Sequence, residues 1–185
     1  MDMPEKIEAE RIVLKKPEPS FELAKIIFAA VEESRENIRP WLAWADKTLK
    51  PEDSYEFLIN WCEKNWQNKT GFTYLFYDKT DGRLLGCIDL LDVKEKHKSG
   101  DIGYWIRSSA EGKGYMHEAV LTLEKAAFDA GFNRITIGND TRNTRSANVA
   151  ARAGYHLDGV LRQNRWSEYW QSFADSNVWS KLKSD

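Results

Sequence analysis

The sequence has little cysteine and no long apolar run. Its 185 residues include two cysteines, Cys62 and Cys87, which are too few for a disulfide framework. There is no Cys-x-x-Cys pair or Cys/His cluster, so we expect no metal site. No apolar run approaches membrane-spanning length, and the first six residues lack the apolar centre of a signal peptide. We therefore expect a reduced, cytoplasmic protein with no membrane partner.

A dominant sign of charge is also lacking. The 27 Lys and Arg residues nearly balance the 29 Asp and Glu residues, and the net charge is −2. Bulk electrostatics therefore gives no reason to expect nucleic acid as a partner. At this length and with 42% hydrophobic residues, we expect one domain, residues 1–185, with a sizeable core. The eight tryptophans are a surplus, and such flat side chains suit a ligand pocket as well as a core.

Hydrophobic periodicity predicts alternating strands and helices. Strands are expected over residues 7–15, 71–77, 84–91, 102–107, 134–138, 155–165 and 173–182. Helices are expected from the N-cap Ser20 to about Glu36, from Pro51, from about Tyr115 to the stop at Gly131, and over 147–153. The strand–helix–strand unit in the second half predicts a mixed α/β (α+β) sheet with a parallel pair at its middle.

The first ligand motif is a strand, a glycine turn and a helix start. Ile102, Tyr104 and Ile106 alternate with less apolar residues, and Gly112 and Gly114 follow just before the helical pattern. A turn at a helix N-terminus presents free N–H groups and the positive end of the helix dipole, which together suit a phosphate. The spacing matches neither the Rossmann motif nor the P-loop. Alone, this stretch predicts a phosphate-bearing ligand and nothing finer.

A second motif stands before the short helix in the second half. Residues 143–146 read Asn-Thr-Arg-Ser, and the helix after them ends at Ala-Gly-Tyr, residues 153–155. With residues 102–106, 111–118 and 173–178, this motif resembles the GCN5-related N-acetyltransferase (GNAT) superfamily, and within it the RimJ/RimL type of ribosomal-protein N-terminal acetyltransferase. The resemblance covers nearly the whole chain. It implies a single-domain GNAT fold: a mostly antiparallel twisted sheet of about seven strands, helices on both faces, and a splayed parallel pair at the cofactor site.

The resemblance implies acetyl-CoA as the donor and no metal. The turn would hold the pyrophosphate through the main-chain N–H groups of Gly112, Lys113, Gly114, Tyr115 and Met116. The strand end, Trp105, Ile106 and Arg107, would pair with the pantetheine arm and position the thioester. Asn143, Asn148 and Arg152 would contact the cofactor from the short helix, with a solvated helix charge as the alternative for Arg152.

Two residues of the turn depart from the superfamily pattern. Glu111 stands where Gln or Arg is usual, and Met116 stands where Gly or Ala is usual. A carboxylate beside phosphates is unfavourable unless it points away. Main-chain binding tolerates both changes, so we assign no role to the Glu111 side chain and keep the site.

The implied reaction is direct attack of a neutral amine on the thioester carbonyl. A backbone N–H near Ile106 is expected to stabilise the oxyanion. Many members protonate the leaving thiolate with a tyrosine seven residues after the motif asparagine, and that position is Ala150 here. Ser146, four residues earlier on the same helical face, matches the serine proposed as the acid in the RimL type. The alternative for Ser146 is a helix cap.

The general base is less defined by the sequence. The glutamate of the RimL type maps onto Arg165, which cannot act as a base. Glu168 is the candidate catalytic base, with an exposed turn carboxylate as its alternative. Asp89 and Asp175 are further candidates, expected at the acceptor site, and deprotonation through water stays open.

Three functions are compatible with these residues. The first is acetyl-CoA-dependent N-acetylation of a protein N-terminal α-amine, such as that of a ribosomal protein. The second uses a small amine: a polyamine, an antibiotic or an aminoacyl-nucleotide. Trp41 and Trp44, in an aromatic loop, either wall such a pocket or pack on the core. The third is a catalytically silent acyl-CoA-binding module, because the usual glutamate and tyrosine are replaced. We expect a monomer or a homodimer.

Overall fold

The computed structural model describes residues 1–185 and builds one eight-stranded sheet. The strands are β1 Lys6–Glu8, β2 Ile12–Lys15, β3 Phe72–Asp78, β4 Leu84–Lys94, β5 Ser99–Ile106, β6 Arg134–Asp140, β7 His156–Ser167 and β8 Ser172–Leu182. They are ordered β1-β2-β3-β4-β5-β6-β8-β7. Every neighbouring pair is antiparallel except β5 and β6. This confirms the predicted mixed, mostly antiparallel sheet.

The helices pack on both faces of this sheet. They are α1 Phe21–Ile38, α2 Pro51–Glu56, the π-helical turn η2 Phe57–Glu63, α3 Lys64–Asn68, α4 Tyr115–Asp129 and α5 Thr144–Arg152. Three short 3₁₀ segments are η1 Ala43–Asp46, η3 Glu95–His97 and η4 Ser108–Ala110. The predicted cap of the first helix is confirmed, because the Ser20 Oγ accepts a hydrogen bond from the Leu23 N–H at 3.1 Å. No helix has both the length and the apolar character that crossing a membrane requires.

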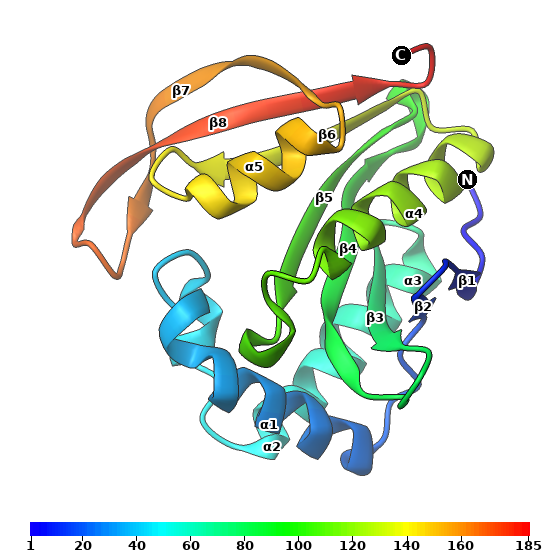
Figure 1. Cartoon of the computed structure of the whole chain (residues 1–185), viewed down its shortest axis with the longest axis vertical. Helices are drawn as coiled ribbons and strands as arrows, with labels where there is room; N and C mark the ends of the chain where they lie inside the picture. The colour runs from blue at the N-terminus through cyan, green and yellow to red at the C-terminus, as the bar shows by residue number, and fades with distance from the viewer.

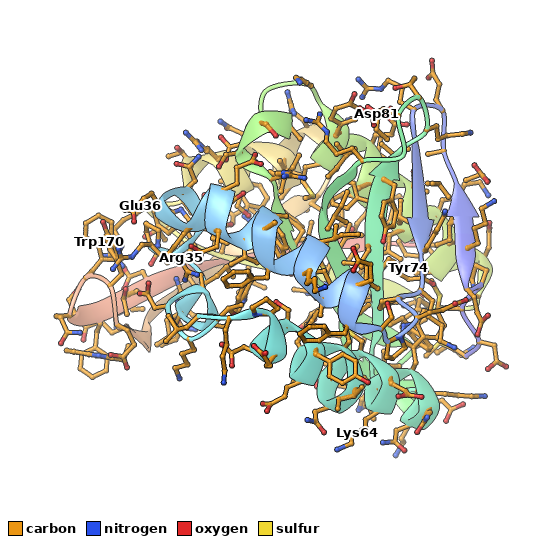
Figure 2. All side chains as sticks on the ribbon, turned by 90° about the horizontal axis from the view of Figure 1, so that it is seen from below. Arg35, Glu36, Lys64, Tyr74, Asp81 and Trp170 are labelled. Atoms are coloured by element: carbon orange, nitrogen blue, oxygen red, sulfur yellow. The ribbon has the colours of Figure 1, made fainter.

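Two cores lie on opposite faces of the sheet. One is built by α4 and α5 with β-strand residues that include Phe72, Tyr74 and Phe76. The other is built by α1 and η2 with residues such as Leu75 and Trp105. Figure 1 shows α4 beside the central strands, and Figure 2, seen from below, shows α1 crossing the other face. Residues of β5 alternate between the two cores, as a strand period of two requires.

The first predicted strand is wrong in its extent. Residues 7–15 form two strands, β1 and β2, that pair antiparallel with Lys6 opposite Lys15. The chain reverses between them, where the Ala9 N–H donates to the Ile12 carbonyl at 3.0 Å. Arg11 in the turn donates from its N–H and its Nε to the two carboxylate oxygens of Glu118, each at 2.7 Å. Residues 9–12, Ala-Glu-Arg-Ile, contain none of the Gly, Pro, Asn or Asp residues that usually mark a turn, so the reversal was missed and the sheet has eight strands rather than about seven.

The parallel pair β5 and β6 is short and then diverges. Their register runs from Ser99 opposite Arg134 to Ile102 opposite Ile137 and ends there. Beyond this point β5 continues beside β4 to Ile106, and β6 continues beside β8 to Asp140. The last four residues of β5, 103–106, therefore have a partner strand on one side only. The predicted splayed pair is confirmed.

The end of β5 lies unusually close to β4 at one glycine. A Cβ built on Gly86 would lie 2.3 Å from the Trp105 carbonyl oxygen and 2.8 Å from the Phe76 ring. Both neighbours are held in place, the first by the sheet and the second by the core. Gly86 therefore lets the end of β5 approach β4 at the point where β5 leaves β6.

We expect Gly86→Ala to destabilise the fold by about 1–3 kcal/mol, because an added methyl group in a packed sheet forces the backbone to move. Urea unfolding followed by circular dichroism measures the change. Gly159→Ala is the matched control, since a Cβ at Gly159 meets nothing within 4 Å. Equal stability of the two variants would contradict the close approach of β4 and β5.

Candidate active site

A cleft of about 680 Å³ opens where β5 and β6 diverge. This volume lies in the usual range for small-molecule sites. Its walls are the end of β5, the glycine turn, the starts of α4 and α5, the end of β6 and the loop after α1. Most of the residues predicted from the sequence line it: Trp41, Trp105, Ile106, Gly112, Gly114, Tyr115, Met116, Asn143, Ser146, Asn148 and Arg152.

Two predicted cofactor residues direct their side chains elsewhere. The Arg107 Nε donates to Glu33 at 2.5 Å, and the Arg107 N–H donates to the Leu85 carbonyl at 2.7 Å. The Lys113 Nζ donates to the Ser109 carbonyl at 3.0 Å. These groups hold the strand end and the turn in shape, so neither side chain lines the cleft.

The glycine turn is built to leave N–H groups free. Gly112 and Gly114 have φ angles of 75° and 81°, in the left-handed region that favours glycine. Gly114 is the N-cap of α4, and no side chain caps this helix end. The first N–H groups of a helix lack intrahelical partners, so they are available to an anion here. Met116 is buried in the core, which leaves its backbone as the part that can face a ligand.

The unusual Glu111 is neutralised across the cleft. Its carboxylate accepts from the Arg145 Nη1 on α5 at 2.8 Å and from the Asn37 Nδ2 on α1 at 3.2 Å. Glu111 therefore lines the cleft as one half of an ion pair. This pairing accounts for the tolerance of a carboxylate beside a turn that is expected to bind an anion.

The Ile106 N–H is the backbone donor that faces the gap. In an antiparallel ladder, successive residues alternate between bonding toward the partner strand and bonding away from it. The Arg107 N–H bonds toward β4, at Leu85, so the Ile106 N–H points to the other side. On that side β6 has already diverged. This N–H is thus placed to bind an oxygen in the cleft.

The Ser146 hydroxyl does not cap α5. The cap of α5 is Asn143, whose Oδ1 accepts from the Ser146 N–H at 3.1 Å. The reading of Ser146 as the helix cap is therefore wrong, since Ser146 lies in the first turn. Its Oγ lies 2.9 Å from the Tyr104 hydroxyl, which also donates to the Ser146 carbonyl at 3.2 Å.

Tyr104 is a site residue that the sequence reasoning missed. It lines the cleft from β5, while the position expected for a tyrosine on α5 holds the buried Ala150. Burial raises the pKa of Tyr104 to about 12, so the phenol stays protonated at neutral pH. The sequence shows a tyrosine on this strand, in the Gly-Tyr-Trp run at residues 103–105. Only the structure shows that its hydroxyl contacts Ser146.

The far end of the cleft carries a buried carboxylate between two arginines. Asp140 is bound by the Arg142 Nε and Nη2 at 2.9 and 2.7 Å, and by the Arg165 Nη2 at 3.0 Å. These bonds, those from Arg142 above all, lower the pKa of Asp140 to about 2. Asp140 and Arg165 both line the cleft. Arg165, which the sequence comparison placed at the position of the RimL-type glutamate, is thus a cation paired with the Asp140 carboxylate.

At this end of the cleft, aromatic side chains from the loop after α1 and from the β7–β8 turn lie close together. The Trp41 ring lies 6.4 Å from that of Trp170, in the turn between β7 and β8, and the Arg142 guanidinium lies 5.1 Å from the Trp170 ring centre. Figure 2 shows Trp170 at this hairpin end, on the same side as Glu36 near the end of α1. Trp41 lines the cleft, whereas Trp44 packs edge-on against Trp105 at 6.0 Å and does not line it.

The three carboxylates considered as bases lie outside the cleft. Glu168 is exposed in the turn after β7. Asp175 accepts from the Gln163 N–H at 2.7 Å. Asp89 lies on β4 beside the Cys87 thiol, and burial raises its pKa to about 6. No group of three or more His, Cys, Asp or Glu side chains is arranged to hold a metal ion.

Comparison with known proteins agrees with this geometry. The family described as "Acetyltransferase (GNAT) domain" matches residues 11–156. The ribosomal-protein-serine acetyltransferase of Escherichia coli (strain K12) is 26% identical over 116 residues, which cover 62% of this chain and 64% of that protein.

Two solved structures share the fold. RimL, a ribosomal L7/L12 alpha-N-protein acetyltransferase solved in complex with coenzyme A, has a TM-score of 0.89 at 19% identity, over 98% of this chain and 100% of that chain. The microcin C7 self-immunity acetyltransferase MccE, in complex with acetyl-CoA and AMP, has a TM-score of 0.85 at 24% identity, over 94% of this chain and 93% of that chain. Since the family match spans most of its length, the chain belongs to the GNAT family of acetyltransferases.

Proposed function

We propose that this acetyltransferase takes its acetyl group from acetyl-CoA and transfers it to a primary α-amine, with a protein N-terminus as the favoured acceptor. The observation that carries the proposal is the free edge of β5 beside the uncapped start of α4. An extended pantetheine arm fits the edge that β6 leaves, and a pyrophosphate fits the turn of Gly112 and Gly114. RimL and MccE, which share the fold, were solved with coenzyme A and acetyl-CoA.

Residues at the end of β5 and the start of α5 would supply the transition-state contacts. The Ile106 N–H would donate to the oxygen of the thioester carbonyl as it becomes negative, an interaction that strengthens during the reaction. The Ser146 hydroxyl would give its proton to the departing thiolate. The Tyr104 phenol, 2.9 Å from the Ser146 Oγ, would replace that proton, and its own proton would return from water.

The acceptor has to lose its proton without an unpaired carboxylate in the cleft. Glu111 and Asp140 are the carboxylates that line it, and both are paired with arginine. With a pKa of about 2, Asp140 holds a proton too weakly to act as the base. We infer that the proton leaves through water. This favours α-amines, with pKa near 7.7–8.0, over lysine and polyamine amines, with pKa above about 10.

An aminoacyl-nucleotide is the second candidate acceptor. It also carries an α-amine, and Trp41 in the cleft wall is available to stack on a base or ring. The catalytically silent module is the weakest candidate, because Ile106, Ser146 and Tyr104 together provide donors for the transfer.

The direct test is a thiol-release assay on a panel of amines, after acetyl-CoA binding is measured by thermal shift. We expect acetyl-CoA to raise the melting temperature of the protein. We also expect thiol release when the acceptor is a peptide with a free N-terminus. An N-blocked peptide that contains lysine, and spermidine, should react far more slowly. Absence of binding would overturn the proposal, and binding without turnover on any amine would favour the silent module.

We expect Ser146→Ala to lower kcat about a hundredfold, since general-acid assistance contributes at least that much, while the affinity for acetyl-CoA changes little. Tyr104→Phe should lower kcat in the same direction, and the double variant should be no slower than Ser146→Ala because the two groups act in series. Thr144→Ala, exposed on the same helix, is the control. Additive losses in the double variant would contradict the relay.

Asp89→Asn tests whether this buried carboxylate is a base or only a cost to the fold. Because its pKa is raised to about 6, its ionisation destabilises the protein progressively as the pH rises from the unfolded value near 3.8 through 6. At pH 8 the free energy of unfolding of the variant should therefore exceed that of the wild type by up to about 3 kcal/mol. At pH 4 the two should be equal.

The control for this experiment is Asp92→Asn, an exposed carboxylate on the same strand. Urea unfolding at the two pH values gives the stabilities, and thiol release gives the rate. A large loss of kcat in Asp89→Asn, with an inflection near pH 6 removed, would identify Asp89 as the base and contradict the water route.

A further inference from the structure

Two guanidinium groups share one buried carboxylate at the acceptor end of the cleft. The Arg142 Nε and Nη2 donate to Oδ1 and Oδ2 of Asp140, which is a bidentate arginine–carboxylate pair. Arg165 adds a third bond to the same carboxylate, through one Nη only. One carboxylate therefore serves two guanidinium groups, and Arg165 makes the smaller share of the bonds to it.

Arg165 retains unused donors that reach the cleft. It lines the cleft, and its side chain is 37% exposed. Its Nε is buried and has no hydrogen-bond partner. A guanidinium has five N–H donors in a fixed fork, and a single bond to Asp140 leaves most of them unspent. The bond to Asp140 uses Nη2 and the Nε is buried, so the donors that remain for an anion in the cleft are those of Nη1.

The other carboxylates near these arginines do not pair with Arg165, whose ion pair is with Asp140. Arg142 stacks on Trp170 and completes the pairing of Asp140. Asp175 lies close enough to Arg142 to raise its pKa, but its carboxylate accepts from the Gln163 N–H. Glu168 is exposed in the turn and does not line the cleft.

The second arginine is also not needed to keep Asp140 paired. If Arg165 were lost, Asp140 would retain both bonds from Arg142, and no buried charge would be left alone. Pairing therefore does not explain Arg165, whereas a negatively charged ligand does.

We propose that the acceptor carries an anionic group, a carboxylate or a phosphate within a few bonds of its α-amine, and that Arg165 binds this group between β7 and the Trp41 wall. The inference rests on the proposed acetyl transfer and narrows its acceptor class. Arg165 is on this account a specificity-determining residue. An acidic N-terminal peptide and an aminoacyl phosphate both present this chemistry.

The experiment compares acceptors that differ only in the anion. The peptide arm pairs Ala-Glu-Ala amide with Ala-Gln-Ala amide, and the phosphate arm pairs O-phosphoserine amide with serine amide, so every acceptor carries an α-amine. For the wild type we expect kcat/KM about tenfold higher for the anionic member of at least one pair, mostly through KM. The arm with the larger ratio identifies the source of the anion.

Arg165→Gln should bring that ratio to about one, and Arg165→Lys should keep part of it because the charge remains without the fork. Arg162→Gln, exposed on the same strand, is the matched control and should keep the wild-type ratio. Circular dichroism and acetyl-CoA binding confirm that each variant is folded.

Two results would overturn the inference alone: equal kcat/KM within both pairs for the wild type, or a ratio that survives Arg165→Gln. Both leave acetyl transfer standing, since thiol release is still observed. Acetyl-CoA binding with no thiol release from any amine would instead overturn the proposed function, and this inference with it.

Discussion

The divergence of β5 from β6 is the constraint on which the rest of the site depends. Their parallel pairing ends at Ile102 and Ile137, yet both strands continue, each held by a neighbour on its other side. A sheet edge inside the molecule is costly if nothing pairs with it, because buried N–H and C=O groups need partners. The opened edge therefore creates both the space for an extended ligand and the donors that bind it.

Other elements are arranged around this opening. The glycine turn ends β5 and starts α4 without a side-chain cap, so an anion can replace the missing cap. On the opposite wall, Asn143 caps α5 and so leaves the Ser146 hydroxyl free to meet Tyr104. A cleft lined by two helix starts, one strand edge and one hydroxyl pair has the parts that acyl transfer requires.

Much of this could be predicted from the sequence, because its signals are local. The alternation at residues 102–106, the glycines at 112 and 114 and the Asn-x-x-Ser motif each specify a conformation within a few residues. The β1–β2 reversal was missed because residues 9–12 lack the usual turn residues, and the bonds from Arg11 to Glu118 that hold the turn join residues far apart in the chain. The Tyr104–Ser146 contact and the sharing of Asp140 by two arginines were missed because they also join residues far apart in the chain. Spacing reveals which residue types are present, whereas their partners depend on how β5, β6 and β7 are brought together.

The most direct test of the account is amide hydrogen exchange with and without acetyl-CoA. If the free edge of β5 and the turn hold the donor, the amides of residues 103–106 and 112–116 should exchange more slowly when acetyl-CoA is present. The tip of the β7–β8 hairpin, residues 168–171, should change little, because it borders the acceptor end. Protection confined to the hairpin, or none along β5 at saturating acetyl-CoA, would contradict the claim that the divergence of β5 and β6 is the donor site.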